Sequence, residues 1–479
     1  MVSMRSRFEL LVGLYGDERT EELLSAEATI RSWLRVEAAL ATAQGELGVL
    51  APEDAAAIGA AARLEHIDTE LLWRETRNVG YPILSLVRQV DAALPAARRG
   101  HVHYGATTQD IMDSGLALRL DAAADRLAAL LGDFGDSLAR LAERHVRTLM
   151  AGRTHALHAV PTTFGAKLAG YLGELARHRD RLAAARSRVA VVSLFGAGGT
   201  SAAYGARAPE LRARVAELLG LATTDLPWHV ARDSMAEFGL VTALLTATCA
   251  RFAREVVDLS RTEIAEVAEA AGHHRGASST MPQKANPIES EAVIGLATTA
   301  GALSSALFRG MEAGHERAAG EWQAEWQVLP QLVSLGAAAL ATAASVATGL
   351  RVFPEAMRAN LSADGGLIMA EAYLMRLAPV LGRERAHDAV YQAAGECRRT
   401  GRPLGTTLAA TLAAELPTNL AAELAGGLAP EDYVGHPEKT VAAGLALWGA
   451  PTSHSGSPSS TAPARDPDAG PAVVELGDS

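Results

Sequence analysis

The chain has little cysteine and few aromatic residues. Its two cysteines, Cys249 and Cys397, lie in helical sequence without a partner motif, which excludes a disulfide framework and a thiolate metal site and fits a reducing cytoplasm. Aromatic residues make up 5% of the 479 residues, whereas hydrophobic residues make up 49%. The cores must therefore be built from Ala, Leu and Val, which favours long, closely packed helices. Strand-type alternation is scarce, and apolar spacings of three and four residues dominate.

Positive charge is also in short supply. The formal net charge of -11 argues against nucleic acid or an anionic membrane surface as the main partner. An anionic substrate must then be met by locally placed Lys and Arg side chains. Residues 1–14 lack the apolar core and small-residue cleavage site of a secretory signal, so we expect a cytoplasmic protein.

Two uncharged runs, residues 292–308 and 328–350, are rich in Ala, Gly, Ser and Thr. Such residues suit close helix contact in a bundle at least as well as lipid contact, so we expect no membrane span. The adjacent His273 and His274 lack the helical spacing of a zinc site. Residues 196–200 lack the Lys-Ser/Thr ending of a phosphate loop, so they are interpreted as a turn, and no metal is expected.

The sequence predicts an all-α protein of three domains and a tail. Residues 1–106 contain short helices broken by Gly and Pro, and residues 351–449 contain short helices again. Residues 450–479 are dominated by Pro, Ser, Thr, Gly and Ala and are expected to be disordered. Residues 107–350 carry five long helical patterns, near residues 110–141, 161–190, 233–268, 287–310 and 325–350. The first of these patterns shows its apolar residues on one face, and Thr107 or Thr108 can cap its first turn.

The segment from Gly276 to Pro287, GASSTMPQKANP, places hydroxyl, ammonium and amide groups in one short stretch. Glycine permits unusual backbone conformations and proline stops helix extension, so this is an ordered loop between helices, and such loops tend to carry function. Its spacing Ser-Ser-x-Met-Pro-x-Lys-x-Asn-Pro resembles the signature of the fumarase/aspartase superfamily, whose members eliminate a group from a succinyl skeleton.

The resemblance implies a role for several loop residues. The superfamily's catalytic base falls on Ser278, with Ser279 beside it in the substrate site. A serine hydroxyl is a poor base unless its alkoxide is stabilised, so backbone N–H groups and a nearby positive charge must lower its pKa. Lys284 and Asn286 are then expected to hold the carboxylate as it gains enediolate character.

Two further regions resemble the adenylosuccinate lyase and carboxymuconate cycloisomerase branch. In VHYGATTQD, residues 102–110, the substrate-binding hydroxyls fall on Thr107 and Thr108. In GRTHALHAVP, residues 152–161, the general acid falls on His155, and imidazole suits that task because its unperturbed pKa is about 6.5. The carboxylate that orients this histidine in the family matches Glu291.

The resemblance also places Asn78 and Arg232 among the substrate-binding residues. Each segment has a structural interpretation when taken alone: the threonines as helix caps, His155 as a satisfied polar residue at a helix start, and Arg232 with Asp233 as a surface pair. Their agreement with the superfamily pattern, in order and over residues 20–440, favours the functional interpretation.

The chain combines features of the adenylosuccinate lyases and of the cycloisomerases within this branch. Adenylosuccinate lyase has a glutamine where this chain has Ala231, and a basic residue common in both groups is replaced by Ala285. The stretches 78–83, 227–229 and 315–326 look like the cycloisomerase side, yet bacterial cycloisomerases commonly lack a histidine at the position of His155. The resemblance therefore favours a cofactor-independent lyase that cleaves a substituted succinate and releases fumarate, with an amine, a hydrazide or nitrite as the leaving group.

Two alternatives remain: a 3-carboxy-cis,cis-muconate cycloisomerase, which forms a lactone and no fumarate, and a non-catalytic structural homologue. The resemblance further implies a homotetramer that acts on a small anionic dicarboxylate. In such a tetramer the central helices form a common core, and each active site is assembled from three subunits.

Overall fold

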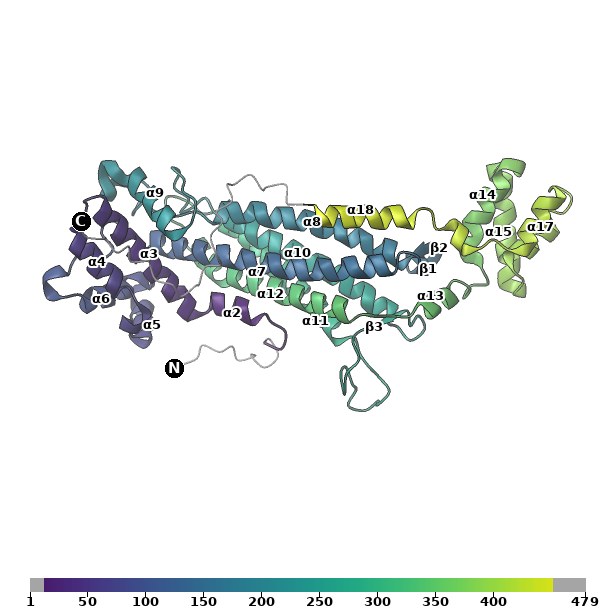
Figure 1. The fold of residues 1–479 in the computed structure, drawn as a ribbon, viewed down its shortest axis with the longest axis horizontal. Coiled ribbons are helices and arrows are strands. Elements are labelled where there is room, and N and C mark those ends of the chain that lie inside the picture. Colours follow the sequence, from purple (N-terminus) through teal and green to yellow (C-terminus); the bar gives the residue numbers. More distant parts are fainter. Residues whose placement is uncertain (1–12, 451–479) are drawn as a thin grey trace, which may run out of the picture.

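Long helices dominate the computed structural model, which describes residues 13–450 (Figure 1). They run side by side through the middle of the molecule, and a smaller helical unit lies at each end. The predicted all-α class is confirmed, with short strands at the end of the bundle near the C-terminal unit. The predictions for the first twelve residues and for the tail after residue 450 lie outside the described residues.

The N-terminal unit is made of short helices around its own apolar cluster. Its elements are α3 (Ala26–Glu46), α4 (Pro52–Ala61), η1 (Leu64–His66), α5 (Thr69–Val79), α6 (Ile83–Ala93) and η2 (Ala96–Arg98). The preceding helix, α2 (Glu18–Leu24), packs its Leu24 against the central bundle instead. Two later elements, η3 (Ala202–Arg207) and α9 (Ala208–Leu219), complete the same cluster. This core therefore includes residues far beyond position 106.

The central bundle consists of α7 (Thr108–Arg144), α8 (Phe164–Val189), α10 (Asp233–Leu259), α11 (Ile288–Gly310) and α12 (Glu321–Gly349). The apolar stripe predicted for α7 is buried along its length, at Leu116, Leu120, Leu127, Leu131, Phe134, Leu138 and Leu141. Thr107 is the N-cap residue, and the Asp110 carboxylate accepts a hydrogen bond from the Thr107 backbone N–H at 3.2 Å. The sequence thus encodes both the buried face of this helix and its start.

Two of the predicted helix boundaries are wrong. Residues 161–163 belong to an antiparallel hairpin, β1 (Leu149–Thr154) with β2 (Leu157–Thr163), and α8 begins only at Phe164. The α10 helix ends at Leu259 and not near residue 268. The chain turns over residues 260–264, and Ala265 then takes a positive φ of 51° that a right-handed helix does not allow. The chain then forms β3 (Val267–Ala268), which pairs with β4 (Arg351–Val352).

The C-terminal unit packs around a third apolar cluster. Its elements are α13 (Pro354–Asn360), η4 (Leu367–Met369), α14 (Ala370–Leu381), α15 (Arg383–Thr400), α16 (Leu404–Thr411), α17 (Thr418–Gly426) and η5 (Pro430–Tyr433). The last helix, α18 (Pro437–Gly449), returns to the bundle alongside α8 (Figure 1). Its Trp448 ring lies so close to Gly135 of α7 that a Cβ atom there would sit 2.1 Å from the ring. The boundaries of the three domains stay a prediction.

Three of the described helices, α10, α11 and α12, are long and apolar enough to cross a membrane by length and composition alone. About two-thirds of the apolar window of α10 and of α12 is buried inside the bundle, at 67% each, whereas only 17% of the α11 window is buried. Helix α11 therefore presents apolar surface that no other part of the described chain covers.

A buried histidine links α8 to α10. The Thr248 hydroxyl donates to Glu174 at 2.6 Å, so its oxygen accepts the Nε2–H of His178 at 2.8 Å, while Arg181 donates to His178 Nδ1 at 3.4 Å. This arrangement needs a neutral imidazole. Burial, with a smaller contribution from the positive charge of Arg181, lowers the pKa of His178 to about 4.

We predict that the protein loses stability as the pH falls from about 6.5 to about 4. In this window the unfolded chain protonates His178 and the folded chain does not, so the free energy of unfolding falls by at most about 1.4 kcal/mol per pH unit. His178→Gln is expected to flatten this slope in urea unfolding followed by circular dichroism. The exposed His387, replaced by Gln in the same way, is the control. An unchanged slope in the His178 variant contradicts the prediction.

Candidate active site

The predicted signature loop connects β3 to α11 and is closed at its neck by Gly276 and Asn286. The Gly276 carbonyl accepts the backbone N–H of Asn286 at 2.8 Å and its side-chain Nδ2–H at 3.0 Å. Gly276 has a φ of 66°, and a Cβ atom on it would lie 2.3 Å from the Asn286 carbonyl oxygen, so only glycine fits. Ala277 and Ala285 form a bridge just inside this neck. The loop therefore has a defined conformation, and Asn286 helps to close it.

Ser278 lies half-buried inside the loop. Its Oγ accepts the backbone N–H groups of Thr280 at 3.3 Å and of Met281 at 3.1 Å. Hydrogen bonds to the oxygen favour the alkoxide over the alcohol, which is the condition that a serine base requires. Ser279 and Lys284 are exposed, and no described residue pairs with the Lys284 ammonium group. An anion can therefore approach this ammonium group.

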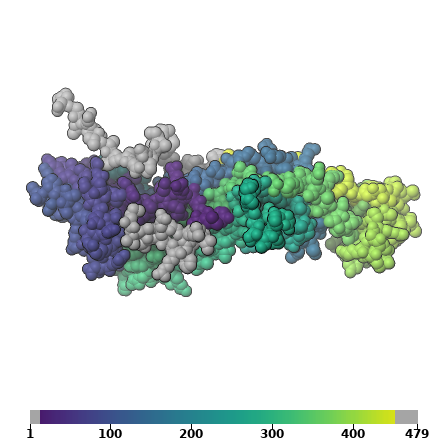
Figure 2. Space-filling model, turned by 90° about the horizontal axis from the view of Figure 1, so that it is seen from below, coloured from purple at the N-terminus to yellow at the C-terminus, as the bar shows by residue number. Residues whose placement is uncertain are grey.

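The start of α11 is anchored by a buried carboxylate. Glu269 Oε1 accepts the backbone N–H and the hydroxyl of Ser290, both at 2.7 Å, and Oε2 accepts the N–H of Glu289 at 3.3 Å. These bonds satisfy N–H groups that a helix start leaves unpaired. Glu291, the predicted orienting carboxylate, is exposed in the same turn. Figure 2 views the molecule from below and shows this part of the chain in teal, on the outer surface of the bundle.

His155 lies at the tip of the β1–β2 hairpin, not at the start of a helix. His155 and Ala156 form the two-residue turn with φ values of 51° and 66°, a conformation that Gly and Asn favour, that His adopts more often than most residues, and that is strained for Ala. Arg153, close to this turn, anchors the hairpin through two bonds to the buried Glu266, at 3.0 and 2.6 Å. The imidazole of His155 is exposed, and no hydrogen bond joins it to Glu291 within the described chain. Backbone strain of this kind is concentrated at functional sites.

Thr107 and Thr108 lie at the opposite end of the bundle, beside an arginine that the sequence analysis did not select. Arg317 donates to Gln109 Oε1 at 3.0 Å, to the Thr107 hydroxyl at 3.3 Å and to the Ala197 carbonyl at 3.2 Å. All three acceptors are neutral, and no described carboxylate pairs with Arg317. A half-buried cation beside the N-terminus of a long helix suits an anion.

Arg232 is buried in the bundle instead of forming a surface pair with Asp233. Its guanidinium donates to Asp113 at 2.8 and 3.2 Å, and on its other side it donates to Glu325. Burial is the main reason that the pKa of Glu325 is raised, and the nearby Asp113 carboxylate adds to this. Arg232 therefore has a structural role in this chain, and its contact with a substrate stays a prediction.

Asn78, the remaining predicted residue, is exposed near the end of α5. The helix stops at Gly80, which has a φ of 87° and turns the chain towards Tyr81. Tyr81 stacks on Trp322 of α12 at 6.0 Å between ring centroids. Asn78 therefore lies on the N-terminal side of the molecule, near the start of α12.

The described chain keeps the predicted residues in three separate groups. With a rise of 1.5 Å per residue, the 37 residues of α7 span about 55 Å. Thr107, Thr108 and Asn78 lie at one end of this helix, and the hairpin of His155 follows its other end (Figure 1). The loop of Ser278, Lys284 and Asn286 protrudes from the side of the bundle. No single group contains an acid, a base and a full set of substrate contacts.

The comparisons with known proteins place this all-α bundle among enzymes of the lyase class. The chain belongs to the fumarase/aspartase superfamily, in the adenylosuccinate lyase and 3-carboxy-cis,cis-muconate cycloisomerase branch. A family model described as "Lyase" matches residues 14–300, and one described as "Adenylosuccinate lyase C-terminus" matches residues 366–443.

Individual relatives agree with this assignment. A 3-carboxy-cis,cis-muconate cycloisomerase of Pseudomonas aeruginosa is 45% identical over 79% of this chain and 82% of its own length. A nitrosuccinate lyase of Streptomyces davaonensis is 39% identical over 80% of this chain and 83% of its own. The crystal structure of the 3-carboxy-cis,cis-muconate lactonizing enzyme of Pseudomonas putida superimposes with a TM-score of 0.85 at 37% identity, covering 92% of this chain and 99% of that one.

Proposed function

We propose that this chain is a lyase that removes a substituent from a substituted succinate by β-elimination and releases fumarate. The observation that carries the proposal is the exposed imidazole of His155, held on a strained hairpin turn. An acid presented in this way suits protonation of a departing group. The hydrogen-bonded Ser278 supplies the matching base, and Lys284, which has no partner among residues 13–450, supplies the cation.

The proposed cycle has two proton transfers. Ser278, as the alkoxide, takes the proton from the carbon beside one carboxylate, and the electron pair of that C–H bond forms an enediolate. Lys284 and Asn286 stabilise this dianion, an interaction worth about 3 to 4 kcal/mol for each donor. The carbon–carbon double bond then forms as the bond to the leaving group breaks, and His155 gives that group its proton. Glu291 is assigned to orient the imidazole.

The second carboxylate of the succinate is assigned to the other end of α7. The hydroxyls of Thr107 and Thr108, the free N–H groups of the first helical turn and the Arg317 guanidinium supply donors and positive charge there. Arg317 has only neutral partners within residues 13–450, so binding an anion breaks no existing ion pair.

A cycloisomerase that closes a lactone is the second candidate, because the Pseudomonas aeruginosa relative with that name is 45% identical. The decisive experiment incubates the purified protein with substituted succinates and with 3-carboxy-cis,cis-muconate, and measures fumarate and lactone separately. The proposal expects fumarate from at least one succinate and no lactone. Lactone without fumarate would overturn it in favour of the cycloisomerase.

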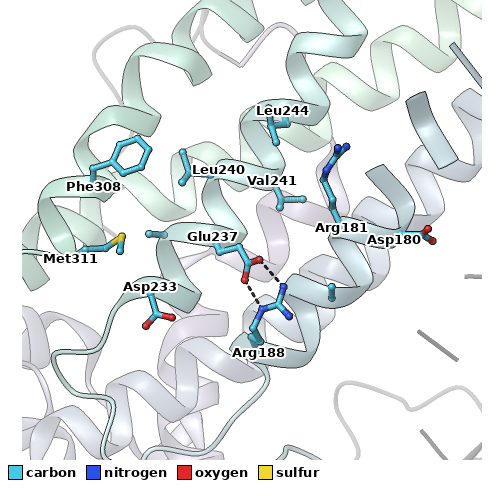
Figure 3. Close-up of a pocket in the computed structure, with 12 residues that line it drawn as sticks. Asp180, Arg181, Arg188, Asp233, Glu237, Leu240, Val241, Leu244, Phe308 and Met311 are labelled. Carbon is cyan, nitrogen blue, oxygen red and sulfur yellow. Dashed lines mark hydrogen bonds and ion pairs between the residues drawn. The ribbon is translucent and has the colours of Figure 1, made fainter. Parts of the chain in front are cut away.

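The separation of the three groups supports an active site shared between the subunits of a homotetramer. The apolar surface of α11 supports subunit contact as well. A cavity of about 620 Å³ lies between α8, α10 and α11, lined by Leu240, Leu244, Phe308 and Met311 beside the Arg188–Glu237 ion pair (Figure 3). Leu244, Phe308 and Met311 are 49%, 54% and 46% exposed, so a second copy of the chain packing on this groove buries apolar surface.

Complementation tests the shared site. We predict that His155→Ala and Ser278→Ala chains, each inactive alone, regain activity when co-assembled, because some sites then receive the intact histidine from one subunit and the intact serine from another. Random assembly at equal ratio restores roughly a quarter of the sites. A mixture of Ser278→Ala and Lys284→Ala chains is the matched control, because both changes lie on one loop and no mixed site is intact. Activity no higher than that of the control would refute sharing.

A further inference from the structure

A cluster of aromatic rings surrounds Gln323 at the start of α12. Tyr81 stacks on Trp322 at 6.0 Å, and the Trp326 ring meets Tyr81 and Trp322 edge-on at 6.1 and 4.8 Å. Trp322 is buried and donates its indole N–H to Asp113 at 3.3 Å. The rings therefore form a fixed wall from the α5–α6 turn to the first two turns of α12.

Only one of the two polar atoms of the Gln323 side-chain amide has a hydrogen-bond partner within this wall. Its Nε2 donates to the Tyr81 hydroxyl at 3.2 Å. Its Oε1 is shielded from water and has no hydrogen-bond partner among the described residues. A buried carbonyl oxygen without a donor is unfavourable, and a ligand that brings a donor removes this cost.

The aromatic wall lies at the same end of the bundle as Thr107 and Arg317, which are assigned to the second carboxylate of the substrate. The Trp322 indole and the Gln109 amide both donate hydrogen bonds to the Asp113 carboxylate, the second at 3.1 Å. The carbonyl oxygen of the Gln109 side chain accepts a hydrogen bond from Arg317. Arg317 in turn touches the Thr107 hydroxyl. A continuous chain of contacts thus joins Gln323 to the residues assigned to the substrate, whereas His155 and the loop of Ser278 lie elsewhere on the described chain.

We propose that Gln323 is a specificity-determining residue whose Oε1 accepts a hydrogen bond from an N–H of the substrate's substituent. This rests on the proposed function and narrows it: the preferred substrate is a succinate with an amine- or hydrazide-type nitrogen, and the leaving group is not nitrite. A nitro group has no N–H and leaves Oε1 unsatisfied. The flanking rings of Tyr81 and Trp326 suit the apolar part of a substituent on that nitrogen.

The nitrogen-bearing substrate also fits the proton balance of the elimination. Ser278 takes the proton from carbon, the carbon–nitrogen bond breaks with its electron pair going to nitrogen, and His155 returns one proton to that nitrogen. The products are fumarate and a free amine or hydrazide, and the step needs no oxidant or reductant. Gln323 takes no part in proton transfer, so its effect lies in binding and orientation of the substituent.

The test compares Gln323→Met with the wild-type enzyme on an N-substituted aspartate and on 2-nitrosuccinate. Methionine has a similar length but neither accepts nor donates a strong hydrogen bond. The variant is expected to lose about 10- to 100-fold in kcat/KM on the nitrogen-bearing substrate, mainly through KM, and to change less than about 3-fold on 2-nitrosuccinate. Gln327→Met, an exposed position on the same helix, is the matched control and should alter neither value.

The outcomes distinguish a failure of the proposed role of Gln323 from a failure of the proposed fumarate-releasing function. Equal losses on both substrates, no loss on either, or a wild-type preference for 2-nitrosuccinate overturns the role of Gln323 and leaves the fumarate-releasing function standing. No fumarate from any substituted succinate overturns both. Thermal unfolding of the variant checks that the aromatic wall is intact, because a disrupted wall would lower its midpoint well below that of Gln327→Met.

Discussion

A Ser278→Ala enzyme is expected to retain its fold and lose about 10²- to 10⁴-fold in kcat, the range that general-base catalysis contributes. The loss should fall on kcat more than on KM, because the base acts only as the carbon–hydrogen bond breaks. The alkoxide that Ser278 must become is favoured by the N–H groups of Thr280 and Met281. Steady-state release of fumarate at saturating substrate measures the effect.

The control for this variant separates chemistry from loop structure. Removing Oγ also removes the acceptor of two backbone N–H groups, so the loop itself could change. Ser278→Thr keeps the hydroxyl and should recover a measurable part of the activity, and circular dichroism should show equal helix content in both variants. Undiminished turnover by a folded Ser278→Ala protein would rule out this residue as the base.

The second large effect is expected at His155. His155→Asn should lower kcat by about 10²- to 10⁴-fold on a substrate whose leaving group needs a proton. At the same time its resistance to urea should be equal to or greater than that of the wild type, because Asn tolerates the positive φ of 51° better than most residues. Activity and stability thus move in opposite directions, which a merely structural histidine would not produce.

Ala156→Gly is the matched control for the strain at this turn. Relief of the positive φ at Ala156 is expected to stabilise the hairpin by about 1 kcal/mol while leaving the imidazole in place. Fumarate release and urea midpoints are measured for both variants. Near-wild-type activity of His155→Asn would remove the histidine from the mechanism, and a large loss of stability would contradict the account of the turn.

The long helices were largely predictable because their apolar residues repeat at the helical period. The buried stripe of α7 and its cap at Thr107 both follow from local sequence. The hairpin was missed because its strands are short and its turn, His155-Ala156, lacks the Asn-Gly chemistry that marks such turns. The end of α10 was missed for a similar reason, since no Gly or Pro marks the turn over residues 260–264 that follows Leu259.

Some residues of the candidate site could likewise be predicted from the sequence, and others could not. Ser278, Lys284, Asn286 and His155 were selected from motifs, which report residue types at fixed spacing. Arg317 became visible only when its side chain was seen beside Thr107, 210 residues away in sequence. Arg232 looked like half of a surface pair, yet it is buried between Asp113 and Glu325, because helices remote in sequence close around it.

The sequence by itself determined the helical class, the superfamily and the residue types of the candidate site, because helical period and motif spacing are local properties of the chain. The tertiary structure decided which polar groups already have partners, which conformation holds His155, and that the three groups of candidate residues lie apart on one chain. These features depend on contacts between segments far apart in sequence, and a linear pattern carries no direct record of such contacts.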